Sequence, residues 1–279
     1  MRVPEHGAQR ASTSRSARLT ILAIAFALVA VVSVANPTPA AAAGMKVVVI
    51  VGPVGSSTAN YIYNAKRYAS RARSYGATVV EIYSPNATWA KVKPALQGAK
   101  VVIYLGHGNG SPSPYPWSAY SKDGFGLNAA AGKGNSNTKY YGEYYIENRV
   151  VLAPNAVVIL NRLCYAAGNS EWGRANPTKA VAKKRVDNYG AGFLRANARA
   201  VFAEGITSAS YILYGLFKTN RTIGEIFKSS SNWNGAYDFQ FQSTRTPAFR
   251  AWMDPKAPGR YYRSVIGDLG LTAATVRGS

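Results

Sequence analysis

Apolar residues in this chain form short uninterrupted runs that alternate with amphipathic stretches. Five runs have the length and β-branched content of buried strands, at residues 46–51, 78–83, 101–105, 156–163 and 198–204. Helical spacing of apolar residues predicts helices at 57–75, 86–96, 178–197 and 208–218. Strands that are apolar on both faces and separated by helices are typical of a parallel sheet. The pattern therefore predicts an α/β fold with a mostly parallel sheet flanked by helices.

This alternation stops between residues 108 and 154, where Gly, Pro, Ser, Asn and Tyr dominate. Residues 122–127 suggest a hairpin and residues 140–148 a short helix. Long irregular loops inside a compact domain are usually functional, so we expect the long loop 108–154 to wall a binding cleft. Beyond a short helix at 222–228, residues 231–259 have no clear pattern. Residues 260–266 predict a last strand at the sheet edge.

The first 43 residues differ from the rest of the chain. Residues 1–18 are mostly polar and include four arginines, residues 19–35 form a strongly apolar run without a charge, and small residues precede Gly44. This layout is typical of a signal peptide at 1–43 and predicts a secreted protein without stable membrane insertion once the leader is removed. The alternative is an uncleaved N-terminal anchor, because roughly 17 apolar residues suffice to span a bilayer.

The remaining sequence is long enough for one α/β domain. We assign residues 44–230 to this domain and residues 231–279 to a C-terminal extension packed on the same domain. Basic residues outnumber acidic ones strongly, with a net charge of +21, so anionic cell-wall polymers are expected partners. The basic residues are scattered and no nucleic-acid-binding motif accompanies them, which argues against specific nucleic-acid recognition.

Two side chains outside the leader stand out as candidate chemistry. The chain has two histidines and one cysteine, and one of the histidines, His6, lies in the leader. His107 follows the run 101–105 on a Gly-rich turn, and Cys164 follows the run 156–163 on a loop of small residues. Sites in open α/β sheets form at the carboxyl ends of strands, and a histidine base commonly activates a cysteine nucleophile. A turn histidine and a buried structural cysteine remain the alternative interpretation.

Other chemistries have little support in the sequence. The turn at residues 52–55 lacks the Lys-Ser/Thr of a phosphate-binding loop. No cluster of His, Cys and carboxylates has the spacing of metal ligands. We therefore expect neither a metal nor a cofactor.

The motif Gly106-His107-Gly108 and the run that ends at Cys164 resemble the caspase-like cysteine peptidase clan, which includes caspases, metacaspases, gingipain-like enzymes and CHAT domains. In that clan one strand ends in His-Gly and the next delivers the cysteine. Residues 198–205, followed by a helix, also resemble the strand after the nucleophile in CHAT domains. The likeness covers roughly residues 46–228 and implies a caspase-like three-layer sandwich. Caspases have Gln-Ala-Cys and then a glycine at the nucleophile, whereas Arg-Leu-Cys-Tyr occupies residues 162–165 here.

The resemblance implies specific roles for these residues. His107 would be the general base and Cys164 the nucleophile of an endopeptidase that hydrolyses a peptide or protein substrate through a thioester. The amides of Gly108 and Cys164 would form the oxyanion site. A non-catalytic secreted binding protein, attached to anionic cell-wall or surface polymers, is the alternative from a different functional class.

Four further residues are candidates for substrate binding. Strand alternation predicts that Arg162 shares a sheet face with Cys164, and in the resembling peptidases that position lines the pocket for the residue before the scissile bond. An arginine there favours an acidic substrate residue, whereas Glu171 would favour a basic one. Asp123 and Trp117 on the long loop are the other two candidates.

Overall fold

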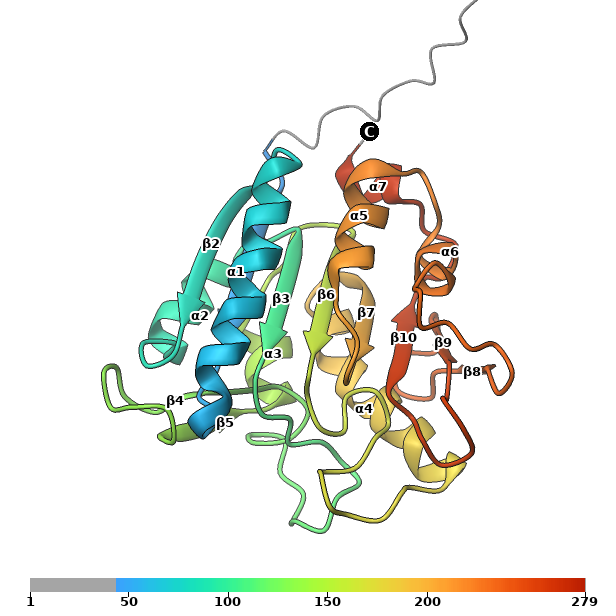
Figure 1. Cartoon of the computed structure of the whole chain (residues 1–279), viewed down its shortest axis with the longest axis horizontal. Helices are drawn as coiled ribbons and strands as arrows, with labels where there is room; N and C mark the ends of the chain where they lie inside the picture. Colours follow the sequence, from blue (N-terminus) through green and yellow to red (C-terminus); the bar gives the residue numbers. More distant parts are fainter. Residues whose placement is uncertain (1–43, 279) are drawn as a thin grey trace, which may run out of the picture. The chain divides into compact units, whose positions relative to one another are not determined.

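An eight-stranded mixed sheet runs through the part of the chain that the computed structural model describes, residues 44–278 (Figure 1). Its strands are β1 (Lys46–Val51), β2 (Thr78–Tyr83), β3 (Val101–Leu105), β6 (Ala156–Asn161), β7 (Ala198–Glu204), β8 (Phe239–Gln242), β9 (Arg250–Met253) and β10 (Arg263–Gly267). Their order across the sheet is β2-β1-β3-β6-β7-β10-β9-β8. The leader or anchor expected at residues 1–43 lies outside the described residues.

The first five strands of that order are parallel, and the last three join antiparallel. Strands β3 and β6 are buried along their whole length, because Val, Ile and Leu supply apolar side chains to both faces. The predicted α/β fold with a large, mostly parallel sheet is confirmed. The shorter strands β4 (Phe125–Asn128) and β5 (Thr138–Tyr141) form a separate antiparallel hairpin.

Helices cover both faces of the sheet (Figure 1). They are α1 (Thr58–Ser74), α2 (Trp89–Leu96), α3 (Glu143–Arg149), α4 (Lys179–Arg195), α5 (Ser210–Lys218), α6 (Ile223–Lys228) and α7 (Ala273–Arg277), with a short 3-10 turn at Gly55–Ser57. One apolar core lies between the sheet and α1, α5, α6 and α7. The second lies between the opposite face and α2, α3, α4 and the β4–β5 hairpin. No helix among the described residues combines the length and apolarity needed to cross a membrane.

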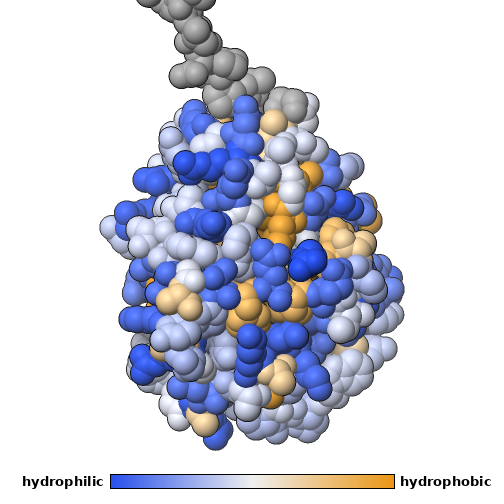
Figure 2. Space-filling view, turned by 90° about the vertical axis from the view of Figure 1, so that its right-hand side faces the viewer, coloured by the Kyte–Doolittle hydropathy of each residue, from blue (hydrophilic) through white to orange (hydrophobic). Residues whose placement is uncertain are grey.

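The antiparallel end of the sheet differs from the prediction. Strand β10 was expected at the edge but lies between β7 and β9, and β8 forms the edge instead. Residues 140–148 also divide between β5 and α3 rather than forming one helix. The face of the molecule at this end is hydrophilic over most of its area, with apolar side chains in small patches (Figure 2).

Lysines of helix α4 lie over the aromatic rings of the edge strand β8. The ammonium group of Lys179 lies 3.8 Å from the ring centroid of Phe239, and that of Lys183 lies 5.0 Å from the ring of Phe241. Lysines and short length are common means of blunting an exposed sheet edge. This end of the sheet therefore closes the domain.

Candidate active site

His107 and Cys164 follow the ends of two adjacent strands. Strands β3 and β6 pair in parallel, with Leu105 opposite Asn161. Each residue lies two or three positions beyond its strand, at the carboxyl edge that points downward in Figure 1. The predicted placement of both residues on adjacent strands at this edge is confirmed.

The loop that carries His107 packs directly against the loop that carries Cys164. A methyl group added to Gly108 would lie 2.0 Å from the carbonyl oxygen of Cys164 and 3.0 Å from its amide nitrogen. A methyl group added to Gly110 would lie 2.3 Å from Cβ of Tyr165. Real Cβ atoms do not approach that closely, so the two backbones meet only because both positions are glycine.

Cys164 lies on a tightly wound turn. Arg162 and Tyr165 have φ angles of 63° and 68°, a region that residues other than Gly, Asn and Asp rarely occupy. The Arg162 amide donates to the Glu204 carbonyl at 2.8 Å, and Asn169 Nδ2 donates to the Leu163 carbonyl at 3.2 Å. Backbone strain held by such contacts concentrates at functional sites. The turn therefore favours a functional position for Cys164.

The same turn corrects the prediction for Arg162. Strand β6 ends at Asn161, two residues earlier than expected. Because Arg162 turns into the left-handed region, strand alternation no longer relates its side chain to that of Cys164, and that part of the argument was wrong. Arg162 and Cys164 nevertheless line one cavity together.

This cavity, of about 600 Å³, is strongly basic. Its charged lining residues are Arg162, Glu171, Arg174, Lys256 and Arg260. Glu171 alone is acidic, and its carboxylate accepts a hydrogen bond from the Tyr115 hydroxyl at 3.1 Å and lies 3.9 Å from Arg174. The charge balance of the lining therefore favours an anionic ligand.

Arg162 is a cation of the cavity lining whose charge has no acidic partner in the described part of the chain. Its Nε is buried and has no hydrogen-bond partner, and no carboxylate of residues 44–278 forms an ion pair with its guanidinium. The Tyr61 hydroxyl donates to its backbone carbonyl at 3.2 Å, which fixes the main chain and leaves the side chain uncommitted. A buried donor without a partner is costly. An anionic group in the cavity would supply a counter-charge to this guanidinium.

Burial shifts both candidate catalytic groups toward their neutral forms. Desolvation raises the pKa of the Cys164 thiol, and the Glu171 carboxylate raises it further, while the Trp172 amide and the charge of Arg185 act in the opposite direction. Desolvation lowers the pKa of His107, although the ring keeps an exposed side, and Glu171 partly offsets this. A neutral imidazole within hydrogen-bond reach of a neutral thiol can act as a base during attack rather than before it, although the cavity that Cys164 lines does not include His107.

Two backbone amides near the thiol are uncommitted. Within residues 44–278, neither the Gly108 nor the Cys164 N–H takes part in a backbone hydrogen bond. The contact between Gly108 and the Cys164 backbone places the two residues side by side, so both amides are available to donate to a ligand near the thiol.

Trp117 and Asp123 occupy different environments. Trp117 is 62% exposed on the long loop and is available for contact. Asp123 is completely buried and accepts a hydrogen bond from the Ser111 amide at 3.0 Å. It therefore stabilises the loop interior and is not accessible to a substrate in this structure.

Several cavity residues were not identified from the sequence. Tyr61 comes from α1, and Lys256 comes from the segment 231–259, which showed no pattern. Arg260 and Tyr262 lie in the stretch expected to begin the last strand, but they precede β10. Trp172 is 98% exposed at the cavity rim. Its position next to Glu171 was the only local signal, because the others depend on where distant segments run.

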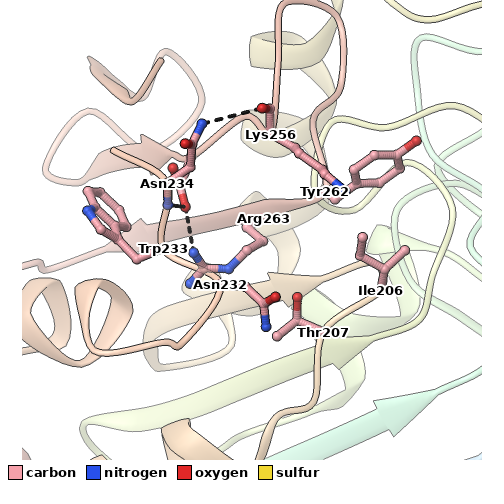
Figure 3. Close-up of a pocket in the computed structure, with 9 residues that line it drawn as sticks. Ile206, Thr207, Asn232, Trp233, Asn234, Lys256, Tyr262 and Arg263 are labelled. Carbon is pink, nitrogen blue, oxygen red and sulfur yellow. Dashed lines mark hydrogen bonds and ion pairs between the residues drawn. The ribbon is translucent and has the colours of Figure 1, made fainter. Parts of the chain in front are cut away.

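A second cavity, of about 340 Å³, adjoins the first and shares Ile206, Lys256 and Tyr262 with it (Figure 3). Arg263 lies in its wall and donates to Asp254 Oδ2 at 2.6 Å. The charges of Arg263 and Asp254 in this wall are therefore already paired. Residues 44–278 contain no group of three or more His, Cys, Asp and Glu side chains that could hold a metal ion.

Comparison with known proteins adds little to this geometry. No protein family and no curated protein matches the sequence. Among solved structures, protein GSU0716 from Geobacter sulfurreducens is similar over 67% of this chain and 87% of its own, with 12% identity and a TM-score of 0.35. That likeness is too low to carry an argument about fold or function.

Proposed function

We propose that this protein is a cysteine peptidase of the caspase-like clan, with His107 and Cys164 as its catalytic pair. The observation that carries the proposal is the contact between Gly108 and the backbone of Cys164. It places the loops of the one described histidine and the one cysteine against each other, at the carboxyl edge of a mostly parallel sheet with helices on both faces. The chain order, His-Gly after one strand and Cys after the next, agrees with the resemblance.

The proposed reaction uses each group in its neutral state. His107 takes the thiol proton as Sγ of Cys164 attacks the scissile carbonyl carbon. The carbonyl electron pair moves to oxygen, which the Gly108 and Cys164 amides stabilise. Collapse breaks the C–N bond, and the imidazolium proton goes to the leaving amine. Water, deprotonated by His107, then cleaves the thioester and releases the acid and the thiol.

The basic cavity supports a preference for an acidic residue before the scissile bond. Arg162 lines the cavity beside the thiol without a carboxylate partner, and a guanidinium binds carboxylates through paired hydrogen bonds. Glu171, the residue that would favour a basic substrate, is already engaged by Tyr115 and Arg174. Replacing Arg162 with alanine should therefore reduce cleavage after Asp and Glu in a peptide library.

An active-site thiol probe tests the catalytic pair. A peptidyl acyloxymethyl ketone with an acidic residue at its reactive end should label the wild type, and Cys164→Ala and His107→Ala should abolish the labelling. Iodoacetamide serves as the control, because it reports thiol access without requiring a substrate site. Equal labelling of the wild type and His107→Ala by the ketone would show that Cys164 is only an accessible thiol.

One observation favours the second candidate, a secreted protein that binds anionic cell-wall polymers. A shallow groove of about 540 Å³ over α1 is lined by hydroxyl and basic side chains: Tyr63, Lys66, Arg67, Ser70, Arg71, Ser74 and Ser210. No acidic residue lines it. Binding through this surface, which we call the α1 groove, requires neither His107 nor Cys164, so the two functions can be separated.

A further inference from the structure

Arg185 of α4 is a buried cation without a counter-ion in direct contact. It is 6% exposed, and no carboxylate of the described residues 44–278 forms an ion pair with it. Its Nε donates to the Pro112 carbonyl at 2.8 Å, and Nη1 donates to the Asn169 carbonyl at 2.8 Å and to Ser170 Oγ at 3.1 Å. The guanidinium also lies 4.7 Å from the ring centroid of Tyr165.

Packing alone does not explain a charge at this place. Burying a guanidinium is costly even when carbonyl groups satisfy its donors, and an apolar side chain of similar volume often fills such a space at least as well. The identity of the acceptors suggests a reason. Pro112 belongs to the loop that begins at His107, whereas Asn169 and Ser170 belong to the loop that begins at Cys164. One rigid side chain therefore bonds both loops.

We propose that Arg185 is a positioning residue that fixes the His107 loop against the Cys164 loop from helix α4. This inference rests on the proposed function, because the register of the two loops matters most for a catalytic pair. A planar guanidinium suits the task, since its donors point in fixed and different directions. Its charge also acts on Cys164, where it favours the thiolate and opposes Glu171.

The neighbouring turn of α4 offers a matched comparison. Asn188 Nδ2 donates to the Ser111 carbonyl at 2.7 Å, so it bonds the His107 loop from the same helix. No hydrogen bond from its side chain to residues 164–170 is among those of the described chain. Removing Asn188 takes away a bond to one loop, whereas removing Arg185 takes away bonds to both loops together with the charge.

The test compares Arg185→Met, Arg185→Lys and Asn188→Ala by the pH dependence of Cys164 alkylation with iodoacetamide and by kcat and KM on an acidic peptide. Arg185→Met should move the alkylation midpoint to higher pH and lower kcat at least tenfold, with KM changed less than twofold. Arg185→Lys should keep the alkylation midpoint, because the charge remains, but it should lower kcat. A single ammonium group cannot reach the acceptors in both loops as the planar guanidinium does. Asn188→Ala should leave the midpoint unchanged.

Wild-type kcat and midpoint in Arg185→Met would overturn the proposal, as would equal effects of Arg185→Met and Asn188→Ala on both quantities. If Arg185→Met does not fold, Ser170→Ala replaces it. A wild-type kcat in both Ser170→Ala and Arg185→Lys would then overturn the proposal. If the wild type cleaves no peptide, the proposed function fails. The alkylation midpoints then still decide whether Arg185 sets the environment of Cys164.

Discussion

Gly108 shows at the scale of one residue how the candidate site depends on close backbone packing. Because its Cβ would lie 2.0 Å from the Cys164 carbonyl oxygen, Gly108→Ala must push the two loops apart. We expect a loss of about 1–3 kcal/mol in the free energy of unfolding, the usual range for overpacking, together with loss of thiol-probe labelling. Urea denaturation measures the first quantity.

Gly270→Ala is the matched control for that experiment. Its φ is not in the left-handed range, and the nearest atom to an added methyl group is Asp268 Oδ1 at 3.6 Å, an ordinary contact. The expected change is within about 0.5 kcal/mol, with normal labelling. Equal behaviour of the two variants would mean that the loops accommodate a side chain at Gly108. The close packing of the His107 and Cys164 loops would then not be required for folding or labelling.

Asp123 gives the folded protein a dependence on pH. Burial raises the pKa of its carboxyl from 3.8 to about 8, and its Oδ2 has no hydrogen-bond partner. The folded state therefore holds a proton that the unfolded state releases above pH 4. Stability from this group is fully present below pH 4, falls by about 1.4 kcal/mol per pH unit as pH rises, and is flat above pH 8.

The variant Asp123→Asn should reduce that decline, because an amide carries no charge at any pH and asparagine tolerates the φ of 63°. Thermal unfolding from pH 4 to pH 8 measures it. The control is Asp268→Asn. Asp268 is far more exposed than Asp123 and pairs with Arg199, so this variant should keep the wild-type decline of stability with pH. An unchanged slope in Asp123→Asn would place the pH dependence elsewhere.

At the scale of elements, the sequence predicts the parallel half of the sheet well. The bounds of β1, β2, β3 and β7 coincide with the apolar runs. In β1 and β3 the reason is clear, because continuous Val and Ile suit a strand that is buried on both faces. Strands β8 and β9 have four residues each, too few for alternation to be distinguished from an irregular segment.

Part of the candidate site could also be predicted from the sequence, and part could not. Its two central residues could be located, because strand ends place His107 and Cys164 at one edge. The cavity could not be foreseen, since Lys256 reaches it from a segment without periodicity, and Arg260 and Tyr262 reach it from a stretch that was expected to be strand but precedes β10. The left-handed turn at Arg162 has no sequence signature either, because arginine carries no preference for that conformation.

The junction between the parallel and antiparallel halves depends on Arg263 of β10. Its guanidinium, 4% exposed, pairs with Glu204 at the end of β7 and with Asp254 just after β9. Removing it leaves two buried carboxylates without a cation, so Arg263→Met should lower the free energy of unfolding by about 3–5 kcal/mol. Chemical denaturation measures this loss.

The comparison is Arg199→Met, which breaks an ion pair between β7 and Asp268 whose side chains are 43% and 37% exposed. Solvent screens that pair, and a loss of up to about 1 kcal/mol is expected. Similar losses in the two arginine variants would show that burial of Arg263 adds nothing to its ion pairs.

At the scale of the whole molecule, some of the excess positive charges are paired with carboxylates and others are not. In the α1 groove, no carboxylate of residues 44–278 forms an ion pair with Lys66, Arg67 or Arg71, and Arg67 lies 5.7 Å from the Tyr63 ring centroid. Elsewhere, cations such as Arg195 and Arg245 are paired with Glu147 and Glu143. Unpaired cations side by side attract a polyanion more strongly than the same charges dispersed.

Binding to purified poly(glycerol phosphate) tests this surface, because its phosphodiesters carry the chemistry of an anionic wall polymer. Arg67→Glu/Arg71→Glu should weaken binding at least tenfold, and binding by the wild type should fall steeply as salt rises to about 1 M, where screening acts within ~3 Å.

Lys91→Glu/Lys93→Glu on α2 is the matched control, because it makes the same change in net charge on the opposite face of the sheet. If both double variants lose affinity equally, net charge and not the α1 groove governs attachment. If only Arg67→Glu/Arg71→Glu loses affinity and its thiol-probe labelling is normal, attachment and catalysis use separate surfaces.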